Sequence, residues 1–261
     1  MSALIDEVPA DWYADAYSAT TSLLPWNDDP DEDLERALRI IEPLSGSRIL
    51  DLACGPGHHA LELAQRGFSV VGVDISEDLV SCAEEIAFRN EEAAGDRLDL
   101  EFLQSDLRDL AFVGEFDVVL NLHDGAVGYL EDDVENRRTF ETIASCLRPG
   151  GRTLMQIPNV LFAESALPAK TWTEGRFAIE LLDRYWNAEN RYVEGSMVPI
   201  ILDDPAAMRE IPFRQRLYSV EELFELFCAV GMSLEAVLDD TGLPSAPTEE
   251  QAEIFVLAGR N

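Results

Sequence analysis

Short apolar runs alternate with helical patterns over residues 47–160 of this 261-residue chain. The apolar runs are SRILDLA, FSVVGVD, LDLEFLQSD, FDVVLNL and RTLMQIP, and the helical patterns among them are HHALELAQRG, SEDLVSCAEEIAFRN and DDVENRRTFETIASCLRPGG. Strands that alternate with helices are joined by right-handed crossovers, which build a parallel sheet with helices on both faces. We therefore expect an α/β fold with a doubly wound, mainly parallel sheet.

The remaining segments are expected to complete one domain that spans residues 1–261. Helices over residues 1–46 would precede the core at 47–160. Residues 161–217 are rich in β-formers and contain a hairpin pattern, FAIELLDRYW-NAEN-RYVEGSMVPI, which predicts a β-rich insertion over the end of the sheet. Residues 218–261 would add the last helix, SVEELFELFCAVG, with a capping box, and the last two strands.

Two glycines, Gly55 and Gly57, lie in the loop after the first apolar run. Ligands of open parallel sheets bind beyond the carboxyl ends of the strands, where this loop would lie. Glycine there allows the backbone to turn and to approach a ligand closely. The dinucleotide fingerprint G-x-G-x-x-G tolerates Ala60 at its third glycine, so the spacing alone does not select the ligand.

Acidic residues at the ends of the first two runs say more about that ligand. Asp51 would repel a pyrophosphate but suits a positively charged ligand; alternatively, it is a partner of the helix N-terminus that follows. Asp74 suits the hydroxyls of a ribose. S-adenosylmethionine has both features, because it carries an ammonium, a sulfonium and an adenosine.

ILDLACGPGHHALELAQRGFSVVGVDIS resembles the first two motifs of class I S-adenosylmethionine-dependent methyltransferases, and LQSDLRDL, FDVVLNLHDGAVGYL and CLRPGGRTLMQIPN resemble the next three in order. The resemblance implies a seven-stranded sheet with the last strand antiparallel, and S-adenosyl-L-methionine as cofactor. It implies these cofactor-binding residues: Asp51, Ala53, Gly55 and Gly57 around the methionine part, Asp74 at the ribose, Ile75, Leu79, Asp106 and Leu107 at the adenine, Asn121 and Leu122 facing the donor methyl, and Tyr17 as a cover.

The charge of the chain restricts its partners and surroundings. With 51 acidic against 19 basic residues, the formal net charge is −32. Self-repulsion of this size is screened in molar salt, where the Debye length is about 3 Å, so we expect a halophile-type protein. The same charge opposes nucleic acid and anionic membranes as partners. The absence of a long apolar run or a signal-peptide pattern, and four scattered cysteines, lead us to expect a cytoplasmic protein without a metal site.

Candidate residues for the acceptor side are fewer. His123 follows the fourth apolar run and could act as a general base oriented by Asp124; the alternative is a loop histidine bonded to backbone. Strand alternation puts Arg214, Arg216 and Tyr218 on one face of the insertion, where they could bind an anionic substrate or pair with local acids.

The sequence therefore predicts a methyltransferase that acts on a small molecule. One alternative is a nucleotide-dependent Rossmann oxidoreductase, which would bind NAD and lack the antiparallel last strand. Another is a non-catalytic protein that binds S-adenosylmethionine. Neither the acceptor nor the oligomeric state follows from the sequence.

Overall fold

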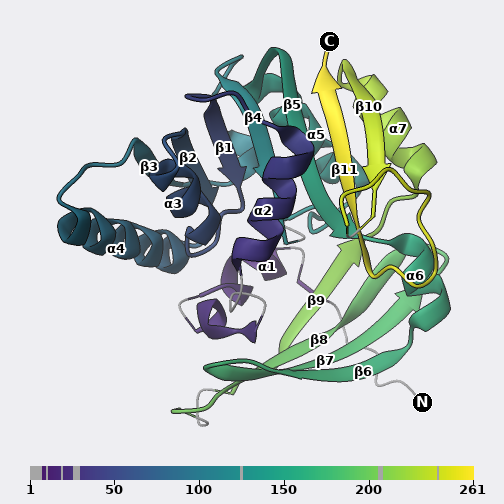
Figure 1. Ribbon diagram of the computed structural model, residues 1–261. Coiled ribbons are helices and arrows are strands. Elements are labelled where there is room, and N and C mark those ends of the chain that lie inside the picture. The colour runs from purple at the N-terminus through teal and green to yellow at the C-terminus, as the bar shows by residue number, and fades with distance from the viewer. Residues whose placement is uncertain are drawn as a thin grey trace.

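Seven strands form the central sheet in the order β10-β11-β5-β4-β1-β2-β3 (Figure 1). They are β1 (Arg48–Leu52), β2 (Ser69–Asp74), β3 (Leu100–Gln104), β4 (Phe116–Asn121), β5 (Leu147–Pro158), β10 (Met232–Leu238) and β11 (Glu253–Arg260). Strands β3, β2, β1, β4 and β5 pair in parallel, whereas β11 is antiparallel to both β5 and β10. The expected mainly parallel sheet with an antiparallel last strand is confirmed. The computed structural model describes residues 8–9, 11–18, 20–25, 30–123, 126–204, 208–239 and 241–261.

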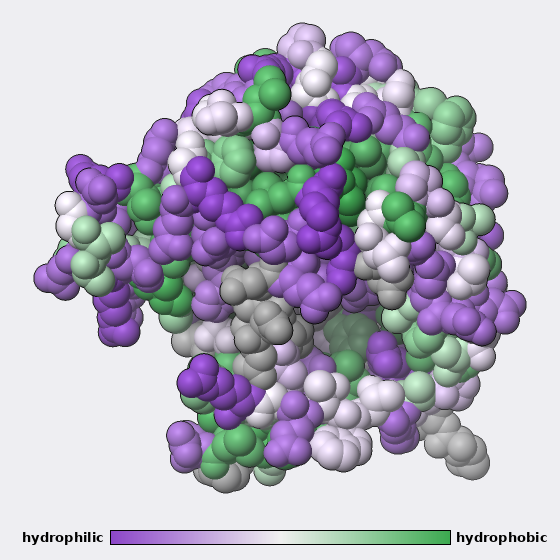
Figure 2. Space-filling view, in the orientation of Figure 1, coloured by the Kyte–Doolittle hydropathy of each residue, from purple (hydrophilic) through white to green (hydrophobic). Residues whose placement is uncertain are grey.

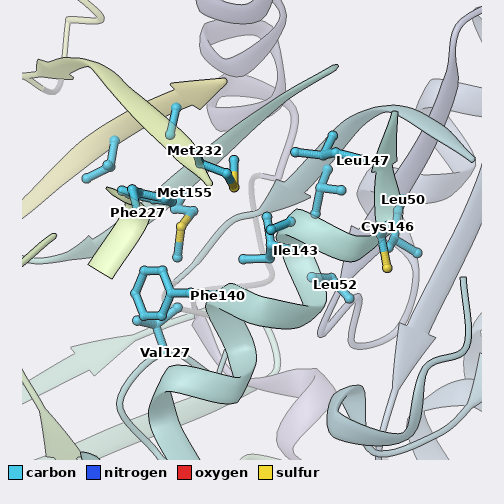
Figure 3. Close-up of a cluster of buried hydrophobic side chains, with 14 of the residues drawn as sticks. Leu50, Leu52, Val127, Phe140, Ile143, Cys146, Leu147, Met155, Phe227 and Met232 are labelled. Atoms are coloured by element: carbon cyan, nitrogen blue, oxygen red, sulfur yellow. The ribbon is translucent and has the colours of Figure 1, made fainter. Parts of the chain in front are cut away.

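Helices cover both faces of this sheet, as the apolar runs require. The helices are α1 (Trp12–Ala16), η1 (Thr21–Leu23), α2 (Pro30–Ile41), α3 (His58–Gln65), α4 (Glu77–Ala94), η3 (Leu107–Asp109), α5 (Asp133–Cys146), α6 (Val160–Ala166) and α7 (Val220–Ala229). On one face, Phe140 and Ile143 of α5 and Phe227 of α7 lie among Leu52 and Met155 of the sheet (Figure 3). On the other face, α2 and α3 bury their apolar sides against β1, β2 and β4. Burial on both faces explains why the strands read as near-continuous apolar runs.

A second, antiparallel sheet lies below the carboxyl ends of the parallel strands (Figure 1). Its strands follow one another in the order β6 (Ala169–Glu174), β7 (Ala178–Asn187), β8 (Tyr192–Ile201) and β9 (Ile211–Arg216). The predicted hairpin is β7–β8, with Ala178 opposite Ile201 and Asn187 opposite Tyr192. A cluster of buried residues joins this sheet to α1, with Trp12 and Ala16 packed near Met197 and Ile211. Helix α1 thus packs against the antiparallel sheet.

Two local expectations differ from the structure. The end of the helical pattern DDVENRRTFETIASCLRPGG, Leu147–Gly151, belongs to β5, where the pairing with β4 shifts register between Phe116 and Val118. In the segment 161–217, helix α6 and edge strand β6 were not expected from the sequence. The predicted capping box on α7 is present, with Ser219 and Glu222 exchanging both bonds.

Hydrophilic residues predominate on the face shown in Figure 2, with smaller hydrophobic patches between them. Among the described helices, none combines the length and the apolarity that crossing a membrane would require.

Candidate active site

A cavity of about 130 Å³ lies at the carboxyl ends of β1, β2 and β4, and we call it the first cavity. Ten of the twelve residues predicted to bind the cofactor line it: Tyr17, Asp51, Ala53, Gly55, Asp74, Ile75, Leu79, Asp106, Leu107 and Leu122. They come from five separate segments of the chain, which the sheet topology brings to one edge. Gly57 and Asn121 are not among its lining residues.

Asp51 is the most buried charged group in this wall. It is 2% exposed, and the backbone N–H of Ala60 in the first turn of α3 donates to its carboxylate. Its other oxygen, Oδ2, is buried without a hydrogen-bond partner among the described residues. Burial, and next the negative charge of Asp74, raise the pKa of Asp51 to about 7. Both interpretations of Asp51 from the sequence therefore have a structural counterpart. One carboxylate oxygen accepts from the N-terminus of α3, and the other has no hydrogen-bond partner among the described residues.

Asp74 is held by backbone N–H groups at the end of β2. Its Oδ2 accepts from Gly55 at 2.8 Å, and its Oδ1 accepts from Ser76 at 2.9 Å. Burial raises its pKa in spite of these bonds, which act in the opposite direction. The carboxylate is thereby fixed in orientation, and it ties the glycine loop to the neighbouring strand.

The two glycines of the loop have different physical roles. Gly55 has a left-handed φ of +55°, and a Cβ there would meet nothing within 4 Å, so this position is open toward the first cavity. Gly57 has a φ of +78°, and a Cβ there would lie 2.8 Å from Cβ of Ala83 and 2.7 Å from Cζ of Phe102. Close approach to a ligand thus applies to Gly55, whereas Gly57 is required by the packing of α3 against α4 and β3.

Asp106 is bound to an arginine that the sequence did not single out. Arg108 bridges it through Nη2 at 2.6 Å, and also donates to Glu131, Glu135 and the hydroxyl of Tyr13. Burial raises the pKa of Asp106, but the Arg108 bonds outweigh burial and lower it overall. The adjacent spacing Asp-x-Arg was the only sequence signal for this pair.

Asn121 has a position beneath the cavity wall. Its side chain is fully buried, and Nδ2 donates to the carbonyl of Leu52 at 3.0 Å, linking β4 to β1. This places Asn121 in the sheet interior, while its neighbour Leu122 lines the cavity.

His123 stands at the rim of the first cavity with a left-handed φ of 52°. Its ring stacks on His59 with centroids 5.0 Å apart, and its backbone N–H donates to Oε1 of Gln156. Its Nε2 lies 3.4 Å from Oδ2 of Asp33 on α2. Asp124, the predicted orienting residue, lies outside the described residues. The carboxylate that the structure places beside His123 is therefore Asp33, 90 positions earlier in the chain.

A second cavity of about 340 Å³ adjoins the first, between the antiparallel sheet, α6 and the end of β5. Tyr17, His123 and Tyr129 line both cavities. The hydroxyls of Tyr17 and Tyr129 are 3.2 Å apart, and their rings are stacked. Tyr129 was missed at the sequence level because it lies in a loop without periodicity. These three side chains form the junction of the two cavities.

The face of β9 that carries the arginines predicted to bind the acceptor points away from the second cavity. On β9, Phe213 and Gln215, together with Leu217 just beyond the strand, line the second cavity, and neither Arg214 nor Arg216 does. Arg216 is 8% exposed and binds Glu222 at 2.6 Å and Asp133 at 3.2 Å, with its guanidinium over the buried ring of Tyr218.

Arg214 lies over Tyr192 and donates to the carbonyl of Glu131. For Arg216 the pairing with local acids, which the sequence left open, is the one observed. The substrate role expected of Arg214, Arg216 and Tyr218 does not agree with this geometry, because alternation defines two faces without saying which one meets the cavity.

Comparisons with known proteins agree with this architecture. Residues 49–151 match the family described as methyltransferase domain. The protein named "Putative methyltransferase YqeM" of Bacillus subtilis is 27% identical, covering 82% of this chain and 84% of the relative. The ubiquinone biosynthesis O-methyltransferase of Rhizobium etli is 31% identical, covering 71% of this chain and 68% of that protein.

Among solved structures, an S-adenosylmethionine-dependent methyltransferase from Clostridium acetobutylicum has a TM-score of 0.71 at 17% identity, covering 88% of this chain and 90% of that one. The antiparallel β11 is the strand that the oxidoreductase alternative would lack. The chain belongs to the class I S-adenosylmethionine-dependent methyltransferases and uses S-adenosylmethionine as its cofactor.

Proposed function

We propose that this methyltransferase acts on a small molecule held in the second cavity. The observation that carries the proposal is the junction, where Tyr17, His123 and Tyr129 line both cavities. In-line transfer requires acceptor and methyl carbon about 3–3.5 Å apart, which adjoining cavities permit. Two similar proteins are named for small-molecule acceptors, a ubiquinone biosynthesis O-methyltransferase and a sugar N-methyltransferase. The net charge of −32 opposes nucleic acid and anionic membranes as alternatives.

In this proposal the first cavity holds the cofactor, which supplies a methyl group on a sulfonium sulfur. The buried Oδ2 of Asp51, which has no partner among the described residues, would accept the ammonium of the methionine part. Gly55 offers an open backbone position beside it. Asp74 would accept the ribose hydroxyls. These residues fit a cationic ligand, because a positive charge would relieve the burial of two neighbouring carboxylates.

The adenine would lie farther along the same cavity. Ile75, Leu79 and Leu107 would form its apolar walls, and Asp106 would accept from its amino group while Arg108 holds the carboxylate in place. Tyr17 would cover the cofactor at the junction.

His123 would remove a proton from the acceptor when the acceptor atom carries one. Asp33, 3.4 Å from Nε2, would stabilise the protonated imidazole and orient the ring. This role is a proposal that extends to Asp33 what the sequence assigned to Asp124.

A single-turnover experiment with methyl-labelled cofactor and a panel of metabolites, in molar KCl, tests the function. Leu182 lines only the second cavity, so Leu182→Trp should abolish methyl transfer and preserve the binding of S-adenosylhomocysteine. Binding of the cofactor without transfer to any small molecule, by the unaltered protein, would favour the non-catalytic alternative. Transfer that survives in Leu182→Trp would place the acceptor elsewhere.

A further inference from the structure

Three charged side chains line the second cavity: Glu180, Arg184 and Glu253. Glu180 and Arg184 project from the same face of β7, four residues apart, and Glu180 is only 8% exposed. Glu253 is the first residue of β11. Around them the walls are mostly apolar and aromatic, with Trp12 and Phe213 among the lining residues. The cavity therefore combines an apolar body with two carboxylates and one guanidinium.

Glu253 is held in the wall of the second cavity by a buried amide. Nε2 of Gln156 donates to Oε2 of Glu253 at 2.6 Å, and Oε1 of the same amide accepts the backbone N–H of His123 at 3.2 Å. Gln156 is 4% exposed and lies on β5, next to β11. One side chain thus orients both the carboxylate and the loop that carries His123. This places a negative charge close to the point where the methyl group would be received.

Arg184 supplies the opposite charge at another part of the cavity. Its Nε is buried without a hydrogen-bond partner among the described residues. Across the sheet it pairs with Gly195, which in turn pairs with Phe213, so no side chain separates Arg184 from Phe213 in that row. A buried donor without a partner is costly, and more so when it is charged. An oxygen of a bound ligand would remove this cost.

We propose that the acceptor is an amine, and that it carries an oxygen group that Arg184 binds. The inference rests on the proposed function and specifies its substrate. When a methyl group passes from sulfonium sulfur to an amine, positive charge moves onto the nitrogen, and Glu180 and Glu253 stabilise that charge. An oxyanion acceptor would instead be repelled by both carboxylates. The charges in the cavity therefore favour nitrogen as the acceptor atom.

The reaction balances with the groups on hand. The acceptor ammonium gives one proton to His123 and becomes a neutral amine. The amine lone pair forms the new N–C bond as the bond from that carbon to sulfur breaks, and the bonding pair stays on sulfur. The methylated nitrogen carries the positive charge beside Glu253, and His123 releases its proton to solvent.

Three related probes separate the two elements of the proposal: 3-(aminomethyl)benzoate, its isostere 3-(hydroxymethyl)benzoate, and benzylamine, which lacks the carboxylate. Their dissociation constants are measured by ligand-observed NMR on the full chain saturated with S-adenosylhomocysteine in molar KCl. We expect 3-(aminomethyl)benzoate to bind at least about tenfold more tightly than either other probe, because each lacks one charged contact.

Variants assign the contacts. Glu253→Gln and Glu180→Gln should each reduce the preference for the amine over the alcohol, and Arg184→Gln should reduce binding of 3-(aminomethyl)benzoate toward that of benzylamine. Glu249→Gln, an exposed glutamate outside both cavities, is the matched control and should change nothing. Glu253 is itself solvent-exposed, so its variant remains informative even when Glu180→Gln fails to fold.

Equal binding of the amine and the alcohol, no binding of the amine, or a preference that survives both glutamate variants would overturn the proposal. Failure of the proposed function gives a different result. If the proposed function is wrong, the probes do not inhibit the methyl transfer that Leu182→Trp abolishes, or S-adenosylhomocysteine itself does not bind.

Discussion

Replacing each glycine of the loop by alanine tests the separation of packing from ligand contact. In Gly57→Ala the new methyl would lie 2.8 Å from the methyl of Ala83, which cannot turn away because it is on the helix α4 backbone, and 2.7 Å from Phe102. Overpacking costs about 1–3 kcal/mol, and a left-handed alanine costs about 1–2 kcal/mol. The free energy of unfolding should fall by about 2–5 kcal/mol.

Gly55→Ala is the matched comparison, two residues away in the same loop. Its φ of +55° gives the same backbone cost of about 1–2 kcal/mol, but no atom lies within 4 Å of the new methyl. That methyl would instead enter the wall of the first cavity. We expect a smaller loss of stability than in Gly57→Ala, and a dissociation constant for S-adenosylhomocysteine raised at least about tenfold, equivalent to 1.4 kcal/mol.

Urea unfolding followed by circular dichroism, and calorimetric titration with S-adenosylhomocysteine, measure the two effects in molar KCl. Gly57→Ala should keep the affinity of the unaltered protein under folding conditions. A Gly57→Ala variant as stable as Gly55→Ala would refute the packing argument. Unchanged affinity in Gly55→Ala would refute the assignment of this position to the cofactor.

Three further predictions concern charge. The pKa of Asp51 in the folded protein is about 7, above its ordinary value of 3.8. Its contribution to the stability of the ligand-free protein is therefore full below about pH 4 and is lost as the pH rises through 7. Cofactor affinity, which needs the carboxylate, should rise over the same pH range in calorimetric titrations. Arg216→Met should lower the free energy of unfolding by about 1.5–3 kcal/mol, because it removes a charged hydrogen bond to Glu222 while Glu222 keeps its ion pair with Arg191. The KM for the acceptor should not change, and a large rise in KM with full stability would restore the substrate role. Finally, the far-ultraviolet circular dichroism of the chain should report folding only in molar KCl, and full stability without salt would contradict the halophile interpretation.

Much of the fold could be predicted because the central sheet is buried on both faces. Its strands read as apolar runs ended by Asp51, Asp74 and Asn121, and the acids at strand ends marked the cavity. Strand β6 gave no such signal, because all but one of its residues are exposed, including Trp172 at 65%. Helix α6 is short and carries no long apolar period.

The acceptor side could not be predicted because its residues meet only through tertiary structure. Asp33 lies on α2, 90 positions before His123 in the chain, whereas adjacency in sequence suggested Asp124 as the partner of His123. On β9 the alternation was correct, but the face toward the cavity is the one that carries Phe213 and Gln215. Glu253 comes from the last strand, and only the pairing of β11 with β5 brings it to Gln156.

The most direct test of the cofactor site is the substitution Asp51→Asn, measured at about pH 8 by urea unfolding and by titration with S-adenosylhomocysteine. Asparagine keeps the shape and can still accept from Ala60, but it removes the buried charge. We predict that the ligand-free variant is more stable than the unaltered protein, because burying a neutral amide costs less than burying a carboxylate. We also predict that its affinity for S-adenosylhomocysteine falls at least about tenfold, because the ligand ammonium loses its partner. Unchanged affinity, or binding of NAD in place of S-adenosylhomocysteine by the unaltered protein, would contradict the assignment of Asp51 to a cationic cofactor.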